Sequence, residues 1–112
     1  MNLLQETIRV LNEFGKSLKD IQFVYTNEGC FVPTNGCKRF LDVEYDNGYG
    51  DTEIRMDLML VGKDFWLERH EYDGSEWWEF KQLPKFTKNA NRVLSPYDDF
   101  ARSRYGKKNT NN

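Results

Sequence analysis

The sequence predicts a single α+β domain, in which an N-terminal amphipathic helix packs on one face of a twisted antiparallel sheet of about four to six strands. A short helix is expected near the C-terminus. Three observations lead to this fold class: helical spacing of apolar residues at the start, alternation of apolar and polar residues from 40 to 83, and glycine-containing turns between the alternating runs. A chain of 112 residues is long enough for one domain only. We place that domain at residues 1–105 and a disordered tail at residues 106–112.

The first segment has the pattern of an amphipathic helix. Leu4, Ile8 and Leu11 recur every three or four positions, and charged residues occupy the rest of the helical wheel. Asn2 suits the N-cap, with Gln5 three residues later as part of a capping box. A helix with one apolar stripe needs a surface to cover, and the remaining sequence supplies a sheet.

Alternating residues predict the strands of that sheet. The expected strands are 21–26, 30–32, 40–45, 53–60 and two more on either side of Asp73-Gly74. A glycine-rich loop over 46–51 would join the middle pair, and Gly62-Lys63 offers a two-residue turn that pairs Val61 with Asp64. Ser95-Pro96 is a good helix start, and that helix should end near Tyr105.

Alternation then divides the side chains between two faces. The face expected to meet the helix holds Leu41, Val43, Ile54, Met56, Leu58, Leu60, Phe65, Leu67, Trp78 and Phe80. The opposite face, the predicted polar face, carries Asp42, Glu44, Glu53, Arg55, Asp57, Met59, Trp66, Glu68, His70, Tyr72, Trp77 and Glu79.

Charge is distributed unevenly along the chain. The formal net charge is −2, yet residues 42–79 sum to −9 and residues 80–112 sum to +6. Asymmetry of this size indicates a role for charge in recognition. The predicted polar face is the candidate site, because acids outnumber bases there and Asp57 is expected to face Glu68, a pairing that costs stability. Large aromatic residues of the kind enriched at protein interfaces lie among them. We therefore predict partner-binding residues Asp42, Glu44, Glu53, Asp57, Trp66, Glu68, Tyr72, Trp77 and Glu79. An ordinary solvated face, or a face covered by the C-terminal segment, is the alternative.

Catalytic and metal chemistry finds no support in the residue pattern. No pair of carboxylates stands out for acid–base work, and His70 reads as a half-exposed strand residue. The loop over 46–51 lacks the ligand spacing of a calcium loop. Cys30 and Cys37 with a single histidine cannot complete a zinc site. A disulfide between them is sterically conceivable, but a cytosolic setting predicts reduced thiols. We expect no enzyme activity, no metal and no cofactor.

The expected location is the cytoplasm. No apolar run approaches the roughly 20 residues of a membrane span, and the first residues lack the basic start and apolar stretch of a signal peptide.

These observations favour a small non-enzymatic inhibitor that uses an acidic, aromatic sheet face to block a basic functional surface of another protein, such as a nucleic-acid-handling enzyme. No family motif is present. In kind only, the chain resembles phage-encoded inhibitors of host defence, such as anti-CRISPR proteins, and it also resembles toxin-immunity proteins. The alternative is a nucleic-acid-associated protein that binds through the basic C-terminal third, with Lys85, Lys88, Arg102 and Arg104 among the contacts.

Overall fold

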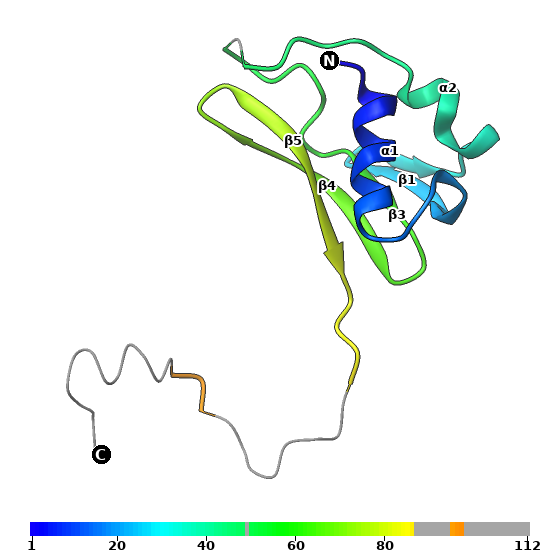
Figure 1. Cartoon of the computed structure of the whole chain (residues 1–112), viewed down its shortest axis with the longest axis vertical. Coiled ribbons are helices and arrows are strands. Elements are labelled where there is room, and N and C mark those ends of the chain that lie inside the picture. The colour runs from blue at the N-terminus through cyan, green and yellow to red at the C-terminus, as the bar shows by residue number, and fades with distance from the viewer. Residues whose placement is uncertain (49, 87–94, 98–112) are drawn as a thin grey trace.

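The computed structural model describes residues 1–48, 50–86 and 95–97. The elements are α1 (Leu3–Glu13), η1 (Leu18–Asp20), β1 (Phe23–Thr26), β2 (Gly29–Phe31), η2 (Asn35–Cys37), α2 (Lys38–Leu41), β3 (Met59–Val61), β4 (Phe65–Tyr72) and β5 (Ser75–Gln82). The α+β class is confirmed, with one helix at the N-terminus and one antiparallel sheet (Figure 1). The short helix α2 lies in the middle of the chain. The helix expected from Ser95 to Tyr105 lies outside the described residues except at 95–97, which form no helix, and the tail at 106–112 lies wholly outside them.

Helix α1 begins where its sequence predicts. The side-chain oxygen of Asn2 accepts a hydrogen bond from the backbone N–H of Gln5 at 2.9 Å, so Asn2 caps the helix. The helix ends at Glu13, and Gly15 follows with φ of 71°, a left-handed conformation that glycine adopts without steric cost. The buried side of α1 packs on β5 and on α2.

The sheet has the order β2-β1-β3-β4-β5, and all neighbouring strands are antiparallel. Strands β4 and β5 form the longest pair, joined by Asp73-Gly74. Both of these residues have positive φ, 52° and 86°, which suits a two-residue hairpin turn. Trp78 and Phe80 therefore share a face with Leu67, as the sequence predicts.

The predicted hairpin over 40–60 is wrong. Residues 38–41 form α2 instead. The described residues of 42–58, all but residue 49, form a long connection in which Glu44 makes an isolated bridge to Asn2. Leu41, Tyr45 and Leu58 are buried without a strand ladder. One of the contacts that attach this connection to the sheet is made by a side chain.

That side chain is Asn47, which bonds the open edge of β5. Its amide donates to the carbonyl of Glu76 at 2.9 Å and accepts from the Glu76 N–H at 2.8 Å. Val43 and Met56, which were predicted on the helix-covered face, are 41% and 39% exposed.

The turn between β3 and β4 differs from the prediction by two residues. Val61 pairs with Trp66 rather than with Asp64, and Leu60 pairs with Leu67. The N–H of Gly62 donates to the carbonyl of Phe65 at 2.8 Å, so the turn is centred on Lys63 and Asp64, one position later than predicted. Because the shift is even, every side chain keeps its predicted face.

The core lies between α1 and the sheet, and it contains an ionic cluster. Leu11, Val24, Leu60 and Leu67 are fully buried around it. Three charged residues form the cluster: Glu6, Arg69 and Glu76, all at most 4% exposed. The two Arg69 terminal nitrogens lie 3.3 Å from the Glu6 carboxylate and 3.0 Å from the Glu76 carboxylate.

Backbone and hydroxyl donors complete this buried cluster. The Tyr45 hydroxyl donates to Glu6 at 2.6 Å, and the Trp78 N–H donates to Glu6 at 3.2 Å. Glu76 accepts from the N–H groups of residues 53 and 54 at 2.8 and 3.2 Å. The cluster thus ties α1, β4, β5 and the 42–58 connection together.

Candidate protein-binding surface

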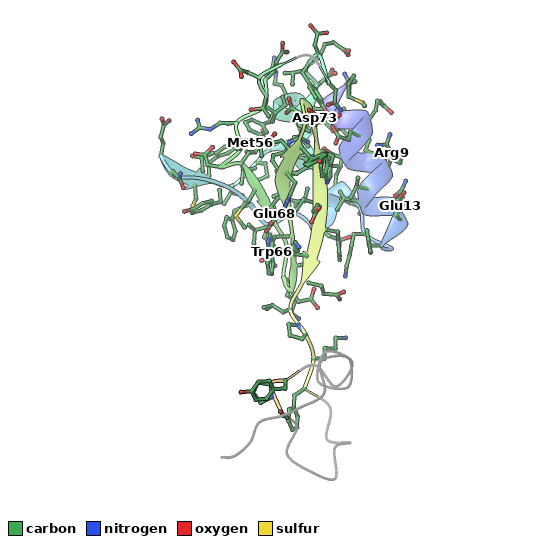
Figure 2. All side chains as sticks on the ribbon, turned by 90° about the vertical axis from the view of Figure 1, so that its left-hand side faces the viewer. Arg9, Glu13, Met56, Trp66, Glu68 and Asp73 are labelled. Carbon is green, nitrogen blue, oxygen red and sulfur yellow. The ribbon has the colours of Figure 1, made fainter. Side chains whose placement is uncertain are left out.

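One face of the sheet points away from α1, and we call it the outer face. The strand register places three rows of side chains on it: Phe23, Val61, Trp66 and Lys81; then Tyr25, Met59, Glu68 and Glu79; then His70 and Trp77. The rows alternate with an inward row in which Val24, Leu60 and Leu67 are buried and Phe80 is partly buried. Figure 2 shows Trp66 and Glu68 on the opposite side of the sheet from Arg9 and Glu13 of α1.

The apolar part of the outer face is large. It consists of Phe23, Tyr25, Met59, Val61, Trp66 and Trp77, of which Tyr25 is exposed and the others are half-buried by their neighbours. No helix in the described part of the chain lies over these side chains. Contiguous exposed apolar surface is a common feature of interaction sites on small proteins.

The polar part of the outer face is a network of two carboxylates, two indoles and a histidine. The Trp66 indole N–H donates to Glu68 at 2.7 Å, and the Trp77 indole N–H donates to Glu79 at 3.2 Å. The His70 Nε2 lies 2.6 Å from Glu68 and 3.6 Å from Glu79, so it joins the two halves. The network fixes both indole rings against the sheet.

These hydrogen bonds keep both carboxylates charged. The indole N–H of Trp66 is the main cause that lowers the pKa of Glu68, and His70 adds to it. Trp77 likewise lowers the pKa of Glu79, helped by Lys81 with its ammonium 3.3 Å away. The outer face therefore presents two carboxylates beside aromatic rings at neutral pH.

A hollow at one end of the outer face extends this chemistry. Its lining includes Tyr25, Met56, Asp57, Met59 and Glu68. Asn27 and Arg69 complete the lining, and of its two carboxylates Asp57 is already paired with Arg55.

Asp57 at the rim of this hollow is held by strong contacts. Arg55 donates to both of its oxygens at 2.7 and 2.8 Å, and the Asn27 N–H donates at 2.9 Å. These donors, Arg55 foremost, hold the pKa of Asp57 well below its usual range. Arg55 also reaches Glu28 at 3.4 Å.

The structure brings only some of the predicted site residues together. Trp66, Glu68, Trp77 and Glu79 lie on the outer face, and Tyr72 lies at its hairpin end, where it is 76% exposed. Asp57 does not sit opposite Glu68 in a ladder, because Met59 does.

Three predicted acids lie off the sheet. Asp42 and Glu44 both accept hydrogen bonds from the Asn2 amide, at 3.1 and 2.7 Å, beside the start of α1. Glu53 lies in the 42–58 connection and accepts from the Asp46 N–H at 3.1 Å. None of the three contributes to the outer face.

Sequence reasoning missed four outer-face residues: Phe23, Tyr25, Val61 and Lys81. Lys81 and Val61 follow from the period of two that starts at Trp77 and Met59, so the signal was present. Phe23 and Tyr25 required knowledge that β1 pairs with β3.

Other chemical groups are dispersed. Within residues 1–48, 50–86 and 95–97, no three His, Cys, Asp or Glu side chains come together to hold a metal ion. Both cysteines are free, Cys30 exposed and Cys37 buried, and burial raises the pKa of the Cys37 thiol to about 11. Over the same described ranges, no helix combines the length and apolarity that crossing a membrane requires.

Comparison with known protein families, with curated proteins and with solved structures finds no match to this chain.

Proposed function

We propose that this protein binds another protein through the outer face and thereby blocks a basic surface of that partner. The observation that carries the proposal is the set of six large apolar side chains on a sheet face that no described helix covers. Burial of such side chains contributes most of the binding free energy in protein interfaces.

The charge of the outer face and its surroundings defines the partner. Glu68 and Glu79 stay ionised beside aromatic rings, and the exposed Asp73 lies in the turn at the hairpin end. A guanidinium group can contact a carboxylate and an indole ring together, which makes arginine the best complement to this arrangement. The partner should therefore present arginine or lysine at the centre of its contact.

The proposal also specifies the result of binding, which is inhibition of the partner. Surfaces rich in arginine and lysine are those with which proteins handle nucleic acids. A small acidic protein that covers such a surface in the cytoplasm acts as a competitive blocker, in the manner of anti-CRISPR or toxin-immunity proteins, and it needs no catalytic group or cofactor of its own.

The test compares baits that differ only on the outer face. Wild-type protein and the variant Trp66→Ala/Trp77→Ala are used to capture partners, and each captured protein is purified and its binding kinetics are measured. The variant should dissociate about 30-fold faster or more, which corresponds to about 2 kcal/mol for a central aromatic pair. Phe86→Ala is the matched control, because Phe86 is an equally large aromatic that is 90% exposed beyond β5.

Two outcomes contradict the proposal. Equal dissociation rates for wild type and the double variant would remove the outer face from the interface. A purified partner without a basic contact surface, whose binding is insensitive to salt, would remove the charge argument.

A further inference from the structure

A groove on the helical side of the molecule has the opposite charge to the outer face. It is an open groove of about 830 Å³ between the α1–η1 segment and the η2–α2 segment. Lys19 of η1 lines it from one segment, and Lys38 and Arg39 of α2 line it from the other. Leu4 and Leu18 contribute apolar lining, and an adjoining hollow adds Ile8.

The backbone fixes the two walls relative to each other. Asn35, Gly36 and Cys37 all have positive φ, 51°, 61° and 67°, and this left-handed turn directs the chain into α2. Cys37 is 1% exposed and anchors the turn in the core. A Cβ at Gly36 would lie 3.6 Å from the Leu18 Cβ, so the two segments are in close contact at the groove.

The three cations of the groove have no anionic partner among the described residues. No carboxylate in that part of the chain lies within 4.0 Å of Lys19, Lys38 or Arg39. Asp42, the one acid in the lining, accepts a hydrogen bond from Asn2. Three cations beside one acid give the groove a positive potential on a chain of net charge −2.

We propose that this groove binds the phosphate groups of a nucleotide ligand. Lysine and arginine are the usual protein partners of phosphate, lysine as a point charge and arginine as a two-pronged donor. The leucine and isoleucine side chains of the lining offer an apolar surface for the sugar and base beside those phosphates. The ligand is either a free nucleotide or a nucleic acid strand, since both present the same chemistry. The site is independent of the outer face, which lies across the sheet.

The experiment measures binding of three probes to the full chain: inorganic triphosphate, adenosine triphosphate and a short oligodeoxythymidine. The test variant is Lys19→Glu/Lys38→Glu/Arg39→Glu. The control variant is Arg9→Glu/Lys63→Glu/Lys85→Glu, which changes the net charge equally at exposed positions outside the groove. Circular dichroism of both variants checks that the fold is kept.

Wild type and control should bind at least one probe, and the groove variant should bind it at least tenfold more weakly. If the ligand is a nucleic acid strand, the oligonucleotide binds tightest, and the slope of log K against log salt falls by about 2 in the groove variant, at about 0.7 per lost contact. If the ligand is a free nucleotide, adenosine triphosphate binds tightest and the oligonucleotide does not compete.

The proposal is overturned if no probe binds wild type, or if the groove variant and the control lose affinity equally. The second result would assign binding to overall charge rather than to the groove.

Discussion

Replacing Arg69 by methionine should lower the free energy of unfolding by about 3–5 kcal/mol, the usual cost of removing one partner from a buried ion pair. Arg69 is 4% exposed and lies between the carboxylates of Glu6 and Glu76, which are 2% and 1% exposed. Methionine keeps the apolar length of the side chain but leaves two buried negative charges without a cation. Small domains have only about 5–15 kcal/mol of stability in total.

Urea denaturation followed by circular dichroism measures this effect. With a slope of about 2 kcal/mol per molar urea, the midpoint should fall by on the order of 2 M. Arg55→Met is the matched control, because Arg55 forms its ion pairs at the exposed surface, where solvent screens them, and its midpoint should hardly move.

A second substitution tests the charge argument itself. Glu6→Gln should destabilise the wild-type protein, because Glu6 accepts from Arg69, Tyr45 and Trp78. On the Arg69→Met background, the same change should restore part of the stability, because it removes one uncompensated charge. An equal cost of Glu6→Gln in both backgrounds, or a loss for Arg69→Met no larger than for Arg55→Met, would refute the reasoning.

Three further changes follow from burial and hydrogen bonding. Cys30 should react with a thiol reagent in the native protein while Cys37, buried and with its pKa raised to about 11, reacts only on unfolding; equal rates would contradict this. Burial and Glu6 raise the pKa of Tyr45 to about 12. The stability that this shift contributes is present below pH about 10 and is lost as pH rises toward 12. Tyr45→Phe should remove that alkaline decline in denaturation midpoints. Leu58→Ala should cost about 2–5 kcal/mol because Leu58 is buried, whereas Asp57→Ala, at the surface, should cost far less, and similar midpoints for the two variants would contradict the assignment.

Local sequence signals predicted α1 and the β4–β5 hairpin. The Asn2 cap, the helical spacing of Leu4 and Leu11, and the Asp73-Gly74 turn act within a few residues, so their effect can be read without knowing the rest of the fold. Trp77 and Trp78 point to opposite faces because they are neighbours in a strand, and the two-residue turn decides that Trp78 faces the core.

The 42–58 connection could not be read in this way. Alternation predicted one buried face here, but only Leu41 and Leu58 of it are buried, without a strand ladder, whereas Val43 and Met56 are exposed. Contacts between distant residues hold the connection, among them the bond between Asn47 and Glu76, 29 positions apart, and no local pattern signals such a contact.

The candidate surface could be predicted only where it depends on a local pattern. Trp66, Glu68, Trp77 and Glu79 lie on one hairpin, where period-two alternation applies. The apolar area beyond them depends on the pairing of β1 with β3 between distant segments. Alternation places Arg69 and Glu76 on the inward side of their strands. Charged side chains are mostly exposed, so their burial could not be predicted without knowing the partner Glu6 on α1.

Indole N–H signals in a ¹⁵N NMR spectrum test the central claim most directly, because the chain has three tryptophans. The Trp66 and Trp77 indoles donate to Glu68 and Glu79 on the outer face, whereas the Trp78 indole donates to Thr7 in the core at 2.8 Å. On addition of a captured partner, the signals of Trp66 and Trp77 should shift or broaden while that of Trp78 stays in place. A bound complex in which all three signals stay unchanged would show that the outer face is not the binding surface.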